Sequence, residues 1–489
     1  MSNSITGKKV AKNLILSVTA QVISILISFI LGFIVPKLID QLQYSYWQTY
    51  LLYVGYVGIL HFGILDGIVL RYSQFDYNEL DKPRIRSQFQ VILVLTSLIT
   101  FFCCLIASFL LNTITKEIVI LVAIGIVTKN IVGFNSYTFQ MTNRIAKYSL
   151  LVILQRVSYA VFVVILLSCR VNNFYWYCIA DLIGDGIAIA IGIIFNREVC
   201  IGKGLSIKEC LKECWLNISA GSLLLVANFT ANLLVGGSKM IIQWRWDELV
   251  FGQVSFSFSV SNIFLTFVTA VSVVLFPSLK RMNSNDLPNM YIRIRNVISP
   301  ILFFVMIAYF PGCWILEHWL PNYSDSLIYL GILLPIIIFS TKVNLLTNNY
   351  LKAYRKEKVM LVVNVVSVII GMIMFALGAY LLNNLNYVLY SLVFVIMLNS
   401  VVSEIIVTKI INKNIVLDFI IELVMTIIFI LSVQFLSRWW ACLAYGCALI
   451  AYFCINYKKV ASMFRDIKRI FFKNKKTIYQ EENNIKEDL

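Results

Sequence analysis

The stretch LVAIGIVTKNIVGF, residues 121–134, decides the fold of this chain. It belongs to an apolar run that is long enough to cross the roughly 30 Å hydrocarbon core of a membrane as one helix. Lys129 lies in the middle of that run. An ionised side chain facing lipid at that depth costs about 2.5 to 3.5 kcal/mol, so Lys129 must have a partner or a wet environment.

Similar apolar runs recur along the whole chain. Of 489 residues, 60% are hydrophobic and only 13% are charged, against roughly 25% charged in soluble domains. The first run follows three lysines and lacks a small-residue cleavage site, so we expect a retained helix rather than a signal peptide. We predict an all-α integral membrane protein with fourteen transmembrane helices, at 14–39, 47–69, 88–111, 118–140, 148–169, 175–196, 216–236, 250–276, 297–316, 326–347, 359–382, 388–408, 415–436 and 439–457.

The basic residues predict the orientation. If residue 1 is cytoplasmic, the inner connections and both termini hold 32 of the 41 lysines and arginines, and the outer connections hold six. This asymmetry follows the positive-inside rule and predicts cytoplasmic N and C termini. The net charge of +16 therefore reflects topology and attraction to anionic lipid headgroups, and we do not expect nucleic-acid binding.

Cysteine and histidine usage argues against a metal site. Most of the eleven cysteines stand singly within predicted spans, where they behave as small apolar residues. The only histidines are His61 and His318, which is too few for a three-histidine metal site. We predict no metal site, no cofactor and no catalytic triad.

Two weak internal matches predict a repeat. PKLIDQLQYSYW from Pro36 resembles SKMIIQWRW from Ser238, and NRIAKYSLLV from Asn143 resembles YRKEKVMLVV from Tyr354. The first match pairs Lys37 with Lys239 at an offset of 202, and the second pairs Arg144 with Arg355 at an offset of 211.

The repeat predicts the domain organisation. We expect a six-helix lobe at 1–196, a cytoplasmic linker at 197–215, a second six-helix lobe at 216–410, an extra helix pair at 411–457, and a basic then acidic cytoplasmic tail at 458–489. Since six is an even number, the two lobes share one orientation, and their pseudo-twofold axis lies along the membrane normal.

Six charged residues fall within or at the edge of predicted spans: Lys129, Arg156, Asp181, Asp185, Lys342 and Glu404. Facing lipid, they would cost on the order of 15 kcal/mol together, as much as the whole stability of a typical domain. Asp181 and Asp185, four residues apart, share one helix face. Asp66 and Arg71 line the inner half of the second span, and Glu404 is expected to be solvated near the inner boundary.

Each charge has a structural alternative. Lys129 or Arg156 could pair with Asp181 or Asp185 and hold the first bundle together, and Lys342 could extend to the membrane surface. The aspartates could also bind a coupling proton or sodium ion. Small residues in GILDGIVL (63–70), GDGIAIAIG (184–192) and LLVGGS (233–238) indicate close helix packing or a flexible break.

Together these features resemble the polysaccharide flippases, which move O-antigen or capsule repeat units, of the multidrug/oligosaccharidyl-lipid/polysaccharide (MOP) exporter superfamily. The resemblance covers nearly the whole chain through topology, and locally GILDGIVLRY (63–72), the segment 251–282 with Gly252, Pro277 and Arg281, and NNYLKAYRKEK (348–358). The chain departs from the family pattern at Gln253 and Val254, where the family often has tyrosine.

The resemblance implies a function. Such a protein carries an undecaprenyl-diphosphate-linked oligosaccharide from the inner to the outer leaflet of the bacterial cytoplasmic membrane by alternating access. Its partners would be that lipid, membrane lipids and the glycan polymerase of the same pathway. The cations meeting the diphosphate would be Arg71, Lys129, Arg156 and Lys342. A proton or sodium gradient could couple through Asp181, Asp185 and Asp66.

Two other classes of function fit the sequence less well. A drug or cation exporter of the same superfamily would rely on carboxylates and aromatic residues and usually has twelve spans. A membrane glycan polymerase or ligase would need a sizeable outer loop with catalytic groups, and the predicted outer connections are short. We therefore expect a transporter and not an enzyme.

Overall fold

The structure is a computed structural model that describes residues 22–110, 112–280 and 286–457, and this part of the chain is built from helices without a strand. In chain order its elements are η1 (Ile30–Ile34), α2 (Val35–Leu38), α3 (Gln41–Val54), η2 (Val57–His61), α4 (Ile64–Tyr72), α5 (Lys82–Leu110), α6 (Thr113–Met141), α7 (Ile145–Ser168), α8 (Phe174–Phe195), α9 (Arg197–Cys200), α10 (Ile207–Arg245), α11 (Glu248–Lys280), α12 (Leu287–Ile307), α13 (Tyr309–Trp319), η3 (Pro321–Tyr323), α14 (Ser326–Leu333), α15 (Ile336–Thr341), η4 (Lys342–Thr347), α16 (Asn348–Ala353), α17 (Glu357–Ala376), η5 (Leu377–Leu381), α18 (Leu385–Ile411), α19 (Val416–Phe435) and α20 (Arg438–Ile455).

These helices make the protein a multi-pass membrane protein. The described residues contain 11 helices long and apolar enough to span a membrane, or up to 13 if each of two bent pairs is one span. A shorter apolar helix, Val22–Leu38, is the described part of the first predicted span. The all-helical fold is thus confirmed, while the total of fourteen spans and the location of both termini stay predictions. Residues 1–21, Arg281 and the tail from residue 458 lie outside the described residues.

Two spans are broken where the sequence has glycine or proline. The helix axis bends by 54° between η2 and α4, where Phe62 and Gly63 have φ of 52° and 87°. Glycine takes such a left-handed conformation at little cost, which explains its position at the break. A second bend of 42° separates α14 from α15 and the helical turns after it, at Pro335. Proline removes a backbone hydrogen-bond donor there.

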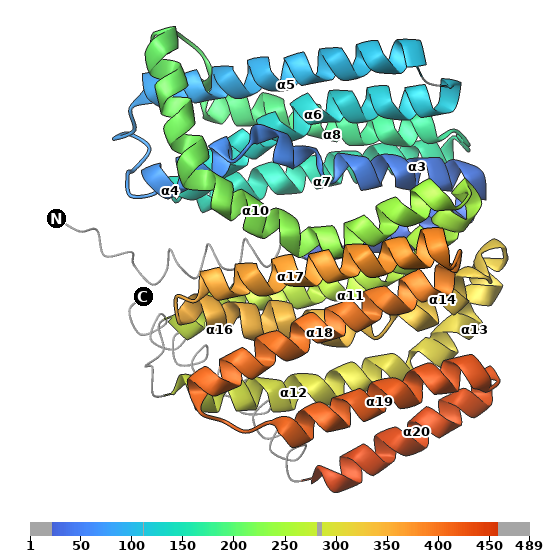
Figure 1. Ribbon diagram of the computed structural model, residues 1–489. Helices are drawn as coiled ribbons and strands as arrows, with labels where there is room; N and C mark the ends of the chain where they lie inside the picture. Colours follow the sequence, from blue (N-terminus) through green and yellow to red (C-terminus); the bar gives the residue numbers. More distant parts are fainter. Residues whose placement is uncertain (1–21, 111, 281–285, 458–489) are drawn as a thin grey trace, which may run out of the picture.

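The helices form two groups with α10 between them (Figure 1). In the first group, α3 to α8, the closest packing joins α5 to α6 and α7 to α8; in the second, α11 to α18, α17 packs on α18 and α11 on α14. The helix α10 packs on α4 of the first group and α17 of the second, while α11 packs on α3. The final pair, α19 and α20, packs on itself and on α12.

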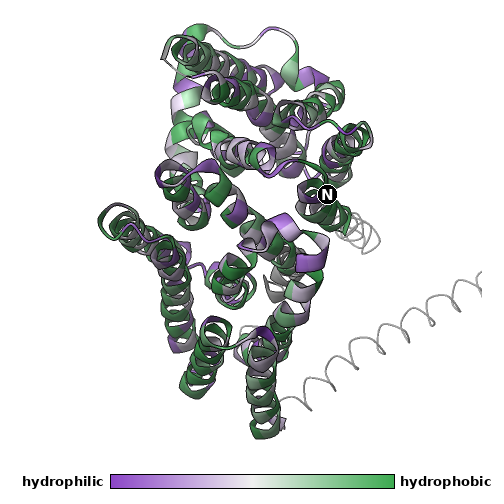
Figure 2. Cartoon of the chain, turned by 90° about the vertical axis from the view of Figure 1, so that its right-hand side faces the viewer, coloured by the Kyte–Doolittle hydropathy of each residue, from purple (hydrophilic) through white to green (hydrophobic). Residues whose placement is uncertain are grey.

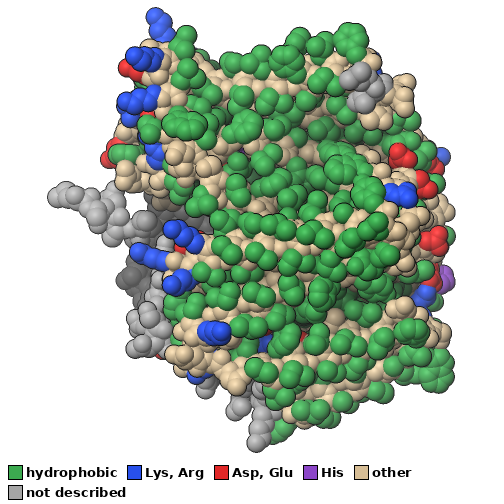
Figure 3. Space-filling model, in the orientation of Figure 1, with side chains coloured by type: hydrophobic (Ala, Val, Ile, Leu, Met, Phe, Trp, Pro, Cys, Tyr) green, Lys and Arg blue, Asp and Glu red, His purple; other side chains and the backbone are tan. Residues whose placement is uncertain are grey.

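Apolar and basic side chains gather on different parts of the visible surface (Figure 3). Figure 3 shows hydrophobic side chains over the middle of the helices and most of the visible lysines and arginines along one edge. Viewed end-on in Figure 2, the helices of both groups show many hydrophobic residues, with hydrophilic residues among them. Below, the inner side is the side predicted to be cytoplasmic, where α6 ends and α7 begins.

The predicted linker at 197–215 is only partly a loop. The helix α10 begins at Ile207, because Ser206 and Glu209 form a capping box that satisfies the first backbone N–H groups. The same helix continues to Arg245. Lys239, predicted to lie in an outer connection, is therefore a helical residue.

The turns that end α6 and α16 have the same geometry. The Arg144 N–H donates to the Phe139 carbonyl at 2.8 Å, and the Lys356 N–H donates to the Leu351 carbonyl at 2.7 Å. The residues just before, Asn143 and Arg355, have φ of 54° and 55°, as in the left-handed turns that commonly end helices. This geometry pairs Asn143 with Arg355, one residue away from the pairing predicted from sequence. The pseudo-twofold relation itself stays a prediction.

Candidate functional site

Lys129 lies between two aspartates in the middle of the first helix group. Its Nζ is 2.8 Å from Asp181 Oδ2 and 3.0 Å from Asp185 Oδ1. Lys129 comes from α6, and both aspartates come from one face of α8, as their spacing of four residues predicts. The Asp185 side chain is fully buried, whereas the side chains of Asp181 and Lys129 are 13% and 23% exposed. The ion pair that we considered as the structural alternative for Lys129 is thus present.

Neutral donors complete the surroundings of the two carboxylates. The Tyr50 hydroxyl donates to Asp181 Oδ2 at 2.9 Å. The Thr128 hydroxyl donates to Asp185 Oδ2 at 2.8 Å, and Gln155 Nε2 donates to Asp185 Oδ1 at 2.7 Å. Helices α3, α6, α7 and α8 therefore all contribute to the Lys129–Asp181–Asp185 triad. With two carboxylates and one ammonium group, the triad is acidic.

Asp66 is buried at the start of α4 and faces His61. Asp66 Oδ2 lies 3.8 Å from His61 Nε2, and the Gly63 N–H donates to His61 Nδ1 at 3.1 Å. Because Nδ1 accepts that bond, a neutral His61 carries its proton on Nε2, toward Asp66. The structure does not bring Asp66 into contact with the triad.

Arg71 ties the inner end of α4 to α10. Its Nη1 donates to Glu213 Oε1 and to Asn217 Oδ1, both at 2.6 Å. Tyr72 donates a further hydrogen bond to Glu213 Oε1 at 2.5 Å. The Arg71 charge is therefore already neutralised by a partly buried carboxylate.

Arg156 has different surroundings from the other predicted cations. It lies in the middle of α7 and is exposed, and the described residues place no carboxylate within ion-pair distance of it. Arg156 lies on the same face of α7 as the buried residues Ser149, Ala160 and Val163, and away from the exposed apolar face of that helix. Arg156 is the one member of the predicted cation set that remains free to meet an anion among the described residues.

Lys342 lies in a second charged cluster, fully inside the second helix group. Its Nζ contacts Glu422 Oε2 at 2.5 Å and also pairs with Glu404. Arg295 of α12 lies 2.8 Å from Glu404 Oε1 and 2.8 Å from Glu422 Oε1, and Asp418 lies 3.6 Å from it. The side chains of Arg295, Lys342, Glu404 and Glu422 are each at most 3% exposed.

This buried cluster corrects two expectations. Glu404 is not solvated, because two cations and the Tyr291 hydroxyl, at 3.0 Å, surround its carboxylate. Lys342 does not extend to the membrane surface, because its ammonium group has two carboxylate partners inside the helix group. Arg295 and Glu422 were missed, although Glu422 lies within the predicted span 415–436 and could have been recognised there.

Lys239 is a further cation that sequence reasoning did not place in the site. It is half-buried in α10, with Nζ at 5.8 Å and 5.6 Å from the ring centroids of Phe251 and Phe258. The described residues offer it no ion pair. Gln243, one turn further and on the same face, accepts a hydrogen bond from the Tyr53 hydroxyl at 2.6 Å. Lys239 therefore lies on a face of α10 that packs on α11 and, one turn further on, contacts α3 of the first helix group.

Comparison with known proteins identifies the fold. No protein-family model and no curated protein sequence matches the chain. Among solved structures, the lipid II flippase MurJ in an inward closed conformation matches with a TM-score of 0.64 and 12% identity, covering 92% of this chain and 100% of that chain. A multidrug resistance MATE family transporter of the MOP superfamily matches in its inward-facing conformation with a TM-score of 0.60 and 12% identity. This match covers 82% of this chain and 98% of that chain. A MATE family transporter of the MOP superfamily in its outward-facing conformation matches with a TM-score of 0.53 and 13% identity, covering 82% of this chain and 96% of that chain.

At such low identity these matches describe the fold alone. They agree with the all-helical, multi-pass architecture described above. The protein has the fold of the membrane transporters of the MOP superfamily.

Proposed function

We propose that the protein is a flippase that moves an undecaprenyl-diphosphate-linked oligosaccharide from the inner to the outer leaflet of the bacterial cytoplasmic membrane, for capsule, O-antigen or a related surface glycan. The observation that carries this proposal is the match to the lipid II flippase over its entire length. That match covers about a tenth more of this chain than the match to the MATE transporter does. The difference is similar in size to the final pair, α19 and α20.

The free cations support a phosphate-bearing substrate. A diphosphate that leaves water needs charged donors that are not already neutralised. Arg156 and Lys239 meet this requirement, since neither has a carboxylate partner among the described residues. Arg71, Lys129 and Lys342 each pair with carboxylates. We therefore retain Arg156 from the predicted cation set, add Lys239 as a substrate contact, and assign the paired cations to holding helices together.

A cation-coupled exporter of small molecules is the second candidate. The acidic Lys129–Asp181–Asp185 triad favours it, because two carboxylates around one ammonium group suit the binding of a proton or a sodium ion. The same triad could equally couple an ion gradient to lipid flipping. The two functions can be distinguished by the compounds that accumulate in cells that lack the protein.

The decisive experiment is deletion of the gene, followed by analysis of the lipid-linked oligosaccharides of the membrane. A flippase predicts accumulation of one such lipid on the cytoplasmic leaflet and loss of surface glycan, both restored by the wild-type gene. Unchanged lipid intermediates together with new sensitivity to cationic drugs would instead establish the exporter.

Complementation by variants then tests the proposed contacts. Arg156→Ala and Lys239→Met are expected to insert normally and to lose at least about tenfold in glycan export, since each removes a charge-assisted phosphate contact. Lys208→Met, at an exposed position of the same helix as Lys239, is the matched control and should restore export. Full export by both Arg156→Ala and Lys239→Met would reject their role in substrate binding.

A further inference from the structure

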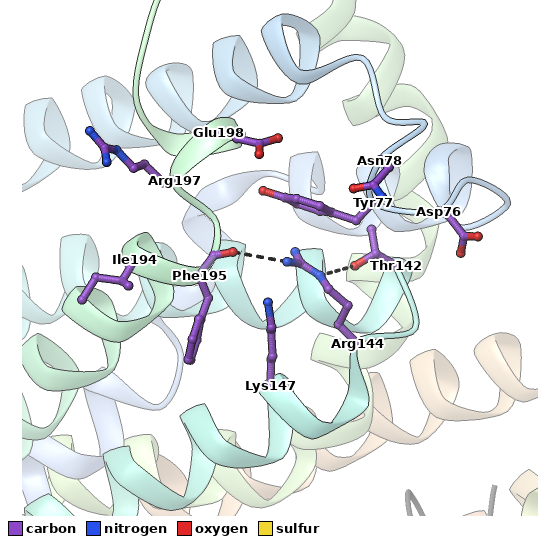
Figure 4. Close-up of a pocket in the computed structure, with 10 residues that line it drawn as sticks. All are labelled: Asp76, Tyr77, Asn78, Thr142, Arg144, Lys147, Ile194, Phe195, Arg197 and Glu198. Carbon is purple, nitrogen blue, oxygen red and sulfur yellow. Dashed lines mark hydrogen bonds between the residues drawn. The ribbon is translucent and has the colours of Figure 1, made fainter. Parts of the chain in front are cut away.

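A pocket on the inner side of the first helix group is separate from the charged sites described above. It has a volume of about 540 Å³ and lies where α6 ends, α7 begins and α8 ends (Figure 4). Tyr77, from the segment between α4 and α5, forms its opposite wall. We call it the inner-face pocket. Its volume falls in the range of sites that hold small organic ligands.

Cationic side chains dominate this pocket. Arg144, Lys147 and Arg197 line it, against the carboxylates Asp76 and Glu198. Figure 4 shows Lys147 and Arg144 rising from the start of α7 into the same space. Lys147 Nζ contacts only the Phe195 ring, at 4.9 Å from its centroid, and the described residues offer its ammonium group no carboxylate.

Arg144 is held in place, with part of its hydrogen-bonding capacity unused. Its guanidinium stacks on the Tyr77 ring at 3.6 Å from the centroid and donates to Thr142 Oγ1 at 3.0 Å and to the Phe195 carbonyl at 3.3 Å. It also bonds Asn196 Oδ1. A guanidinium has five N–H donors, so two remain for a ligand.

The carboxylates of the pocket do not cancel this charge. Glu198 is bound by Lys82 Nζ at 2.8 Å, and that hydrogen bond keeps the pKa of Glu198 below its usual value. The glutamate is thus ionised and already paired. Asp76 is exposed at the rim. Burial raises the pKa of Tyr77, so its phenol stays protonated and can donate to an anion.

Exposed apolar residues adjoin the cations. Ile194, which lines the pocket, is 70% exposed, and Leu150, one turn after Lys147 on α7, is 41% exposed. A site for a soluble anion does not require exposed aliphatic side chains beside it. A lipid headgroup site does, because acyl chains continue from the phosphate into the hydrocarbon layer.

We infer that the inner-face pocket binds the phosphate headgroup of an anionic phospholipid of the inner leaflet, with Lys147 and Arg144 as phosphate donors and Ile194 and Leu150 along the acyl chains. Basic pockets between transmembrane helices on the cytoplasmic side hold anionic headgroups in this way. This binding is independent of the transported substrate. It holds whether the protein is a flippase or an exporter.

The test is native mass spectrometry of the purified full chain, incubated with dioleoylphosphatidylglycerol or with dioleoylphosphatidylcholine. We expect the wild type to retain the anionic lipid in preference to the zwitterionic lipid. Lys147→Gln should lower the retained anionic lipid about fivefold. This variant should melt like the wild type, because the Lys147 ammonium group contacts only the Phe195 ring within the part of the chain that the structure describes. Lys358→Gln, at an exposed lysine at the start of α17, is the matched control and should retain as much lipid as the wild type.

Three results would overturn the inference. Equal retention by the wild type and Lys147→Gln would show that the pocket does not select the lipid. Equal retention of both lipids by the wild type would show that negative charge is not recognised. Displacement of the anionic lipid by millimolar inorganic phosphate would assign the pocket to a soluble phosphate compound.

Discussion

Two carboxylates share one ammonium group in the middle of the first helix group. Asp181 and Asp185 belong to one face of α8, so their backbone positions stay close together as long as the helix is intact. Lys129 therefore separates two like charges that would otherwise repel each other in a medium of low dielectric constant. The neutral donors Tyr50 and Thr128 reduce this repulsion without removing it.

Lys129→Ala is expected to destabilise the protein. Removing one partner of a buried ion pair costs about 3 to 5 kcal/mol, and the 23% exposure of Lys129 places this variant at the lower end. Thermal unfolding in detergent should show a clearly lower midpoint than the wild type. The triple variant Lys129→Ala, Asp181→Asn, Asp185→Asn should recover most of the loss, because it leaves no unpaired charge. If Lys129→Ala is as stable as the wild type, the triad is solvated and not held together by its ion pairs.

Sequence reasoning found this triad and missed other charged residues for a physical reason. Hydropathy and helical spacing place Lys129, Asp181 and Asp185 inside spans and on defined faces. Arg295 and Lys239 lie near the ends of apolar runs, so hydropathy assigns them to connections. Only the helix ends seen in the structure place them inside α12 and α10. The pairing of Lys342 with Glu422 depends on packing between distant segments, which spacing along one helix does not report.

At the level of elements, α4 and α10 are in backbone contact. A Cβ atom added at Gly67 would lie 2.0 Å from the Asn217 carbonyl oxygen, and one added at Gly221 would lie 2.1 Å from the Gly63 carbonyl oxygen. The small residues of GILDGIVL therefore serve close helix packing, as predicted. They also occupy the break before α4.

Gly67→Ala is expected to cost about 1 to 3 kcal/mol through overpacking, since the nearest atoms belong to backbone that cannot rotate away. Thermal unfolding of the purified variant measures this cost. Gly186→Ala on α8 is the matched control, because no atom lies within 4 Å of its added Cβ. Alanine should there be neutral or stabilising by about 0.5 to 1 kcal/mol. If both variants melt alike, α4 and α10 are not packed as described.

Glu422 attaches α19 to the second helix group. Glu422 of α19 contacts Arg295 of α12 and Lys342 of η4. If this contact holds α19 in place, Lys342→Met and Glu422→Gln should each destabilise the protein. The double variant should lose about 1 to 3 kcal/mol less than the sum of the two, as residues in direct contact do.

A surface ion pair provides the control for this comparison of single and double variants. Lys82 and Glu198 are also in direct contact, at 2.8 Å against 2.5 Å for Lys342 and Glu422, but Glu198 is 65% exposed. The changes in stability from Lys82→Met and Glu198→Gln should therefore add with much less coupling than those of the buried pair. Additive changes at both pairs would mean that the buried cluster does not hold α19.

For the whole molecule, the hydrophobic core is continuous on the outer side and divided on the inner side. The largest buried cluster joins Trp47 and Tyr50 of α3 to Phe251 and Phe256 of α11. On the inner side, separate clusters lie within each group, one around Phe134 and another around Tyr291, Tyr350 and Val407. The two helix groups are therefore packed together at their outer ends. Sequence patterns predicted the two groups but not this conformation, because helical periodicity indicates which face of a helix is buried and not how two groups of helices meet.

If the protein is the flippase proposed above, this packing predicts that a covalent link between the outer halves stops transport. Ser45 of α3 lies so close to Gly252 of α11 that their Cβ atoms would be 2.9 Å apart, short of the roughly 3.5 to 4.5 Å of a disulfide but within reach of a small helix shift. In a background without the exposed Cys169, Cys447 and Cys454, Ser45→Cys with Gly252→Cys should form a disulfide on oxidation. Export of surface glycan should cease and return after reduction. Asn135→Cys with Gly192→Cys has the same 2.9 Å separation within the first group, so its disulfide should leave export intact. Export by the oxidised Ser45–Gly252 variant would show that the outer halves need not separate during transport.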